Sequence, residues 1–144
     1  MATKSSIDQL NSFLRGEISA VETYQMALDK LDRTSTARDE LLANLKSHQD
    51  RVMALQEAIT TLGGTPAQGS GPWGAFAKMV EGAAKTLGDK AAVAALEEGE
   101  DHGLKDYKND ISDVGPECRQ VISRLIQQQQ LTHDRLSALK RRLP

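Results

Sequence analysis

The sequence predicts an all-α protein, a bundle of two antiparallel helical hairpins joined by a long crossover that carries a short helix. No stretch alternates β-branched with polar residues, as a half-buried strand would. The long segments are rich in Ala, Leu, Glu, Gln and Lys, which are strong helix formers. Aromatic residues make up 3% of the 144 residues, so the core must be aliphatic. We expect a single domain over residues 1–144.

Two capping signals predict the first hairpin. The spacing of Ser6 and Gln9 matches a capping box and predicts a helix over 6–32. A second box begins at Thr36 and predicts a helix over 36–62. A Gly-Gly pair follows directly and supplies a left-handed stop.

Glycine and proline also divide the second half of the chain. The Gly- and Pro-rich stretch 63–72 predicts a crossover, and a short amphipathic helix is expected over 73–87. Helices over 89–114 and 116–142 complete the second hairpin, with Pro116 at a first helical position. The apolar face of the short helix is expected to pack across the bundle, with a homodimer surface as the alternative.

Each long helix carries an apolar seam in alternating three- and four-residue steps, and each seam is interrupted near its middle. The interruptions are Glu17, His48, Glu100 and the pair Gln129 and Thr132. Removing an ionised carboxylate from water costs several kcal/mol even after relaxation. Each glutamate therefore needs a cation, a metal or a proton as its partner.

Three interpretations of this polar centre follow from the residues. The first is a metal site, with candidate ligands Glu17, His48, Glu100 and His133. The second is a pair of buried ion pairs, Glu17 with Arg51 and Glu100 with Arg135. The third is a water-filled polar layer that fixes the register of the helices.

The two hairpins resemble each other. Gly16-Glu17 with Tyr24 seven residues after the glutamate recurs as Gly99-Glu100 with Tyr107, and Asp50-Arg51 recurs as Asp134-Arg135. In this alignment the residues pair as Glu17 with Glu100, His48 with Thr132, and Arg51 with Arg135. The glycines at 99 and 103 each cost about 1 kcal/mol in a helix relative to Ala, so we expect a neighbouring element to approach closely there.

Several of these features resemble an uncharacterised family of bacterial four-helix-bundle proteins within the ferritin-like, rubrerythrin-related superfamily. They are the Gly-Glu-x6-Tyr element in both hairpins, the stop at 62–66, the turn at 69–71 and the acidic run at 97–101. The resemblance covers roughly residues 6–140 and implies a ferritin-like fold.

The sequence departs from the ligand pattern of the ferritin-like di-iron proteins. Those centres use one Glu from each of two helices and a Glu-x-x-His motif from each of the other two. The lone glutamates are matched, but His48-x-x-Arg51 and Thr132-x-x-Arg135 stand where the motifs belong. A shifted frame recovers His48 and His133 but no glutamate. We therefore expect an arginine-neutralised centre without a cofactor, with iron or another divalent metal as the alternative.

Composition narrows the function classes. A net charge of −2 argues against a nucleic-acid binder, whose affinity would come from contacts to phosphates. No apolar run of about 18 residues or signal segment is present, so we expect a cytoplasmic protein that does not bind membranes. The prediction is a non-enzymatic bundle that acts by association with itself or another protein, with a role in stress physiology. The alternative is a metal-binding or redox protein.

Overall fold

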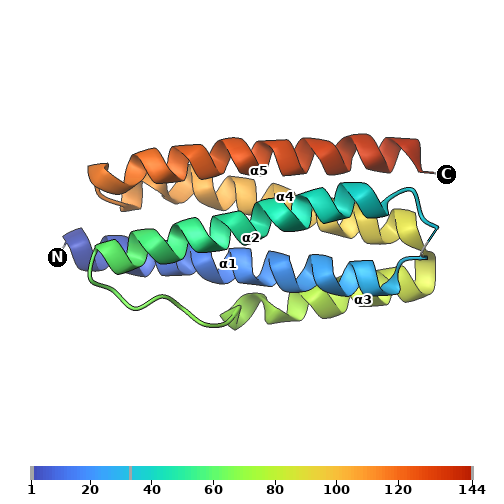
Figure 1. The fold of residues 1–144 in the computed structure, drawn as a ribbon, viewed down its shortest axis with the longest axis horizontal. Helices are drawn as coiled ribbons and strands as arrows, with labels where there is room; N and C mark the ends of the chain where they lie inside the picture. The colour runs from blue at the N-terminus through green and yellow to red at the C-terminus, as the bar shows by residue number, and fades with distance from the viewer. Residues whose placement is uncertain (1, 33, 144) are drawn as a thin grey trace.

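The computed structural model describes residues 2–32 and 34–143, and within them all regular structure is helical (Figure 1). The five helices are α1 (Ala2–Lys30), α2 (Arg38–Thr61), α3 (Ala75–Leu87), α4 (Asp89–Asp110) and α5 (Pro116–Arg142). Two short 3-10 turns, η1 (Gly71–Gly74) and η2 (Ile111–Asp113), precede α3 and α5. The predicted all-α class and hairpin order are confirmed.

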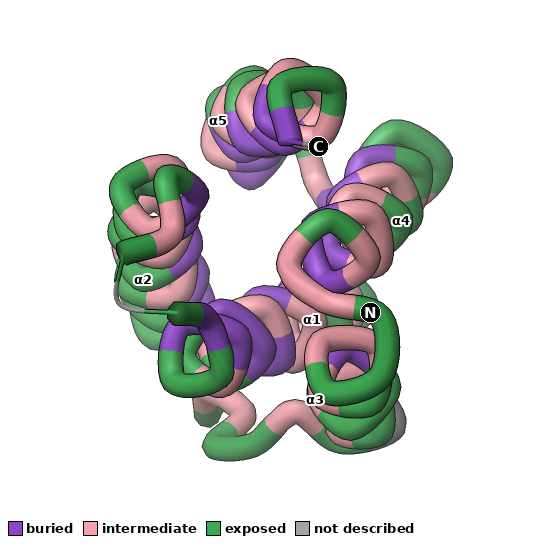
Figure 2. Tube along the Cα trace, turned by 90° about the vertical axis from the view of Figure 1, so that its right-hand side faces the viewer, coloured by how far each residue is buried: buried purple, intermediate pink, exposed green. Residues whose placement is uncertain are grey.

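Four helices surround a common core and the fifth lies outside it. Helices α1 and α2 form one antiparallel hairpin, and α4 and α5 form the other (Figure 1). In the end-on view α3 lies in the outer corner between α1 and α4 (Figure 2). Its Val80 is fully buried, and Phe76 and Ala84 pack against the same core.

Most of the apolar face of α3 therefore packs within the chain, as expected, although Leu87 at its end is 74% exposed. A homodimer surface gains no support from Phe76 or Val80, because both contact the core of their own bundle. The side chain of Trp73, which belongs to the predicted face, lies outside the described part of the structure.

Both predicted helix caps are wrong. Ser6 lies inside α1, fully buried, and its hydroxyl accepts a hydrogen bond of 2.8 Å from the backbone N–H of Gly115. That tertiary contact joins α1 to the α4–α5 connection. Helix α2 begins two residues later than predicted, and the Ser35 hydroxyl, not Thr36, accepts the N–H of Ala37 at 3.2 Å.

The predicted Gly-Gly stop has the left-handed backbone that it needs, and a second glycine of positive φ ends α3. Gly63 has φ +84°, and the N–H of Gly64 donates to the carbonyl of Ile59 at 2.9 Å. Gly88, with φ +88°, separates α3 from α4. Helix α4 ends four residues before the predicted residue 114, because the chain tightens there into η2.

The buried core is divided into two apolar clusters with a polar layer between them. One cluster lies near the α1–α2 turn and includes Leu28, Leu41, Val93 and Leu136. The other lies near the opposite end and includes Leu14, Leu55 and Ile122. Burying each such side chain contributes about 1.5–3 kcal/mol, so the two clusters hold the helices around the polar layer. No described helix has an apolar stretch long enough to cross a bilayer.

Candidate functional site

The polar layer is built by side chains from all four core helices. Each of these residues is at most 4% exposed, although all of them carry polar or charged groups. The set comprises Glu17 of α1, Asn44, His48 and Arg51 of α2, Glu100 of α4, and Gln129 and Thr132 of α5. Because buried polar groups need partners, the geometry of their hydrogen bonds defines the site.

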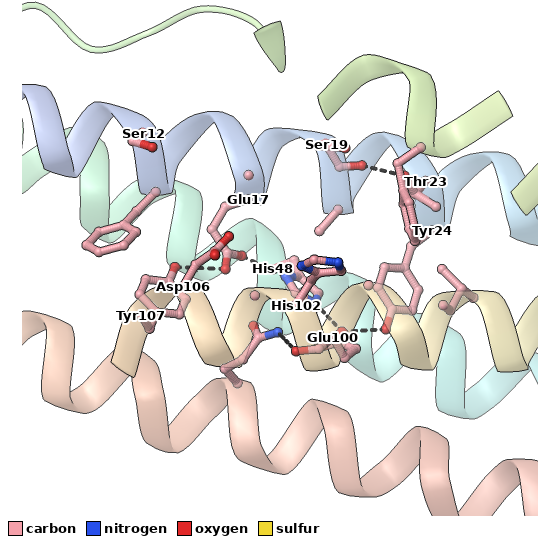
Figure 3. A pocket seen from close by; sticks show the side chains of 18 of the residues that line it. Ser12, Glu17, Ser19, Thr23, Tyr24, His48, Glu100, His102, Asp106 and Tyr107 are labelled. Carbon is pink, nitrogen blue, oxygen red and sulfur yellow. Dashed lines mark hydrogen bonds and ion pairs between the residues drawn. The ribbon is translucent and has the colours of Figure 1, made fainter. Parts of the chain in front are cut away.

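His48 bridges the two buried glutamates. Its Nδ1 lies 2.7 Å from Glu17 Oε2, and its Nε2 lies 2.7 Å from Glu100 Oε2 (Figure 3). An ionised carboxylate only accepts hydrogen bonds, so both ring nitrogens must carry a proton. His48 is therefore an imidazolium ion held between two carboxylates.

The pKa values agree with this assignment. Burial by itself lowers the pKa of His48 and Arg51 lowers it further, but Glu100 and Glu17 outweigh both and raise it to about 9. Burial by itself raises the pKa of Glu100, but His48 and Arg51 overcome that effect and lower it to about 2. The pKa of Glu17 is lowered in the same way, against burial, by Arg51 and His48.

Arg51 supplies the second buried cation. Its Nη1 lies 3.4 Å from Glu17 Oε1 and also donates to the Gln129 side-chain oxygen. Its Nη2 donates to Thr132 Oγ1 at 2.9 Å and to Ser47 Oγ at 3.2 Å. Two carboxylates and two cations leave this centre electrically neutral. Charge balance of this kind limits the cost of removing four ions from water.

The two tyrosines of the internal repeat cross between the hairpins. Tyr107 of the second hairpin donates to Glu17 of the first at 2.8 Å, and Tyr24 of the first donates to Glu100 of the second at 2.7 Å. Burial raises the pKa of both tyrosines well above the usual value, and the neighbouring glutamate adds to each shift. Both phenols therefore stay protonated, and each ties one hairpin to the other.

The structure brings together most of the predicted site residues. Glu17, His48 and Glu100 meet in one cluster, and the predicted pair of Glu17 with Arg51 is formed. His133 lies apart from them: its side chain is 21% exposed and faces Asp101 at 3.8 Å and Asp134 at 3.4 Å.

The predicted pair of Glu100 with Arg135 is not formed, because Asn44 stands between the two side chains. Arg135 donates to Asn44 Oδ1 at 2.9 Å and lies 3.5 Å from Glu40. The Asn44 amide in turn donates to the Tyr24 hydroxyl at 3.0 Å, and Tyr24 donates to Glu100. The charge of Arg135 thus reaches Glu100 only through a chain of neutral groups.

Asn44 is the functional residue that the sequence pattern missed. Leu45 continues the apolar pattern of the second helix, yet Leu45 is partly exposed and its neighbour Asn44 is fully buried. The same one-residue rotation buries Arg51 completely and leaves Val52 partly exposed. The buried polar spacing 44, 48 and 51 follows a regular helical face and was the available signal.

Two close contacts explain the helix glycines. A Cβ atom at Gly99 would lie 2.6 Å from the Phe76 ring of α3, and one at Gly103 would lie 2.7 Å from the Gln129 amide of α5. That amide donates to the backbone carbonyl of Glu100 at 2.7 Å. The expectation that a neighbouring element approaches both glycines is confirmed.

We expect Gly103→Ala to lower the free energy of unfolding by about 1–3 kcal/mol, because the added methyl group displaces the Gln129 amide from its buried partners. Gly82→Ala is the matched control, since a Cβ at Gly82 meets nothing within 4 Å and should add up to about 1 kcal/mol through helix propensity. Urea unfolding of both variants measures the difference. Equal stabilisation by the two alanines would show that the Gln129 side chain can move away from the added methyl group without cost.

A cavity of about 270 Å³ reaches this centre from the surface between α1 and α4. Its walls include the small residues Gly16 and Ala20 of α1 and Gly99 and Gly103 of α4. The buried part is lined by Glu17, His48, Glu100, Tyr24 and Tyr107. The polar centre is therefore buried but connected to the outside.

The residues present do not fit a dinuclear metal centre. Such a centre needs four carboxylates and two imidazoles, whereas the layer offers two carboxylates, one imidazole and a guanidinium group. A single ion ligated by His48 does not fit either, because each ring nitrogen already faces a carboxylate at 2.7 Å. Among the described residues, no group of three or more His, Cys, Asp or Glu side chains is arranged to hold a metal ion.

Comparisons with known proteins agree with the fold. A crystal structure of a ferritin-like, diiron-carboxylate protein from Bacillus anthracis str. Ames superimposes with a TM-score of 0.76 at 19% sequence identity. The superposition covers 97% of this chain and 98% of that one. No curated protein sequence matches significantly. Residues 5–113 match the family described as a domain of unknown function, DUF2383. The chain therefore belongs to the DUF2383 family, and its fold is ferritin-like.

Proposed function

We propose that this protein is a non-enzymatic, metal-independent member of the ferritin-like fold that works by binding another molecule. The observation that carries the proposal is the position of His48, with both ring nitrogens 2.7 Å from carboxylates and the Arg51 cation beside it. These two cations provide the positive charge that metal ions would otherwise bring to the glutamates. The carboxylates are thus satisfied without a cofactor.

The absence of catalysis is proposed from the protonation states at the centre. A general acid or base works best when its pKa lies near the operating pH. The pKa of His48 is raised to about 9, that of Glu100 is lowered to about 2, and both tyrosines are raised well above their usual value. None of these groups exchanges a proton readily near pH 7. The centre holds its charges and hydrogen bonds in place.

Metal loading tests this proposal. After anaerobic incubation with Fe(II), Mn(II) or Zn(II) and desalting, we expect less than about 0.1 metal ion per chain and an unchanged melting temperature, because binding to the native state alone would raise it. Elemental analysis measures the first quantity and calorimetry the second. About one or two ions per chain, lost in the Glu17→Ala, Glu100→Ala variant, would overturn the proposal.

A second variant distinguishes metal bound at the surface from metal bound at the buried centre. Glu22→Ala with Glu98→Ala removes the same number of carboxylates from exposed positions on the same two helices. Metal that this variant loses is bound at the surface and does not bear on the centre. Association with other proteins, the predicted mode of action, stays a prediction and would use faces other than the buried face of α3.

A further inference from the structure

We infer that the cavity between α1 and α4 binds a small organic cation, a primary alkylammonium ion whose charged head lies among carboxylates and whose alkyl chain lies against the apolar wall. This inference rests on the proposed function, because a metal ion at the centre would occupy the buried end of the same cavity.

The shape of the cavity points to a ligand of few atoms. Its volume of about 270 Å³ lies just below the range of about 300–1,000 Å³ that is typical of drug-sized ligands. Gly16 and Ala20 of α1 leave space in the cavity because their side chains are absent or small. A Cβ atom at Gly16 would meet nothing within 4 Å. The opening is thus maintained by side chains that are absent or small.

The charge of the lining selects a cation. Four carboxyl groups line the cavity, those of Glu17 and Glu100 at the buried end and those of Asp106 and Asp110 nearer the surface. The lining contains His48 and His102 but no lysine or arginine. Because His48 and Arg51 balance the charges of the two buried glutamates, the excess negative charge of the cavity comes from Asp106 and Asp110, and an anion would be repelled.

Asp106 has a specific reason to attract a cation. It is partly buried, and burial raises the pKa of its carboxyl group; His102 opposes the shift and Asp110 adds to it. The ionised form is thus poorly compensated by the protein itself. An ammonium group beside Asp106 supplies the missing compensation.

The buried glutamates can each accept one more hydrogen bond. A carboxylate offers about four acceptor positions. Glu17 accepts from His48, Arg51 and Tyr107, and Glu100 accepts from His48, Tyr24 and Thr132. An ammonium group has three N–H donors, so it can use a remaining position at the buried end or the carboxylates nearer the surface.

The remaining wall suits hydrocarbon better than a hydrated metal ion. Phe13, Phe76 and Leu96 line the cavity, and the rings of Tyr24 and Tyr107 adjoin them. Aromatic faces attract organic ammonium groups as well as alkyl chains. A divalent ion would need several converging oxygen or nitrogen ligands, and the described residues hold no such group.

Titration of the full-length protein with n-butylamine at pH 7, followed by ¹H–¹⁵N NMR and calorimetry, tests the inference. We expect saturable binding, with shifts centred on Gly16, Gly99 and Gly103, and an affinity at least about tenfold above that of 1-butanol because of the charge. Sodium butyrate should not bind. Equal binding of butylamine and butanol, or no saturable binding of butylamine, overturns the inference.

Two variants locate the site and one controls for surface charge. Gly16→Leu fills the cavity at a position with free space and should abolish binding while the protein stays folded. Asp106→Asn should weaken binding at least about fivefold, since it removes one nearby charge. Glu98→Gln, an exposed change on the same helix, should leave the affinity unchanged. Retained affinity in Gly16→Leu overturns the site.

The outcomes for the ligand and for the metal-free centre can be told apart. A protein that takes up neither metal nor butylamine retains the proposed centre and loses this inference. A protein that takes up metal at Glu17 and Glu100 loses both, because the ion then fills the buried end of the cavity.

Discussion

Glu17→Gln is expected to lower the free energy of unfolding by about 3–5 kcal/mol, because it leaves a buried positive charge without its partner. The variant keeps the shape of the side chain but leaves the His48 and Arg51 cations with Glu100 as the remaining carboxylate. Tyr107 also loses the charged acceptor that it contacts at 2.8 Å. Urea unfolding at pH 6 measures the change, provided that the slope with denaturant is the same in both proteins.

Two further variants separate this effect from a general loss of charge. Glu22→Gln changes an exposed glutamate of the same helix and should alter stability by at most about 0.5 kcal/mol. Adding Arg51→Met to Glu17→Gln restores a balance of one cation and one anion, so the double variant should be more stable than the sum of the single losses by about 1–3 kcal/mol. A loss below about 1 kcal/mol in Glu17→Gln would show that the pairing is not what holds the glutamate.

The fold could be predicted because its signals are local. Glycines that adopt positive φ, a proline at the first position of α5 and long runs of helix formers specify where helices begin and end within a few residues. The cap predicted at Ser6 failed for a different reason. The Ser6 hydroxyl has a partner at Gly115, more than one hundred residues away in the chain, and such a contact leaves no local mark.

The sequence predicted which residues form the candidate site better than it predicted which of them contact each other. An acidic residue in an apolar seam signals a buried charge, which is why Glu17, Glu100 and their neighbour His48 were found. Their partners depend on how each helix is rotated about its axis, and a rotation of one residue step is enough to change them. Because α2 is rotated so that Asn44 faces inward, Arg135 donates to Asn44 and does not contact Glu100.

The internal repeat predicted the equivalence of residues but not how the copies interact. Glu17 and Glu100 are equivalent in the structure, yet each accepts a hydrogen bond from the tyrosine of the other hairpin. Thr132 and His48 are also equivalent, as the repeat predicted. Thr132 donates to Glu100 at 2.5 Å, as His48 donates to Glu17. These tyrosine–glutamate hydrogen bonds form only once the two hairpins have packed together. The sequence pattern within each hairpin therefore does not reveal them.

The second large effect is expected in the dependence of stability on pH. The pKa of His48 is about 9 in the folded protein, against a usual value of 6.5, so between these values the folded state binds more protons than the unfolded state. Its contribution is complete below about pH 6.5 and is lost as the pH rises through 9. We expect about 3 kcal/mol of stability to disappear over that interval, measured by urea unfolding at a series of pH values.

The acidic side of the profile follows from Glu100. Its pKa is lowered from 4.5 to about 2, so its contribution is present above pH 4.5 and is lost as the pH falls towards 2. Between about pH 4.5 and 6.5 both contributions are complete, and the centre should be at its most stable. This interval includes pH 6, where the Glu17→Gln comparison is made.

Replacing His48 tests whether its imidazole causes the loss of stability at alkaline pH. His48→Gln should be less stable at every pH, but its stability should no longer fall between pH 6.5 and 9, because the titrating group is gone. Gln49→Ala, an exposed change on the same helix that removes no titrating group, should keep the slope of the original protein. A flat profile in the original protein would mean that the folded centre binds no more protons than the unfolded chain, with His48 neutral and both glutamates ionised. One ring nitrogen would then face a glutamate oxygen at 2.7 Å without a proton between them, so the assignment of His48 as an imidazolium would be wrong.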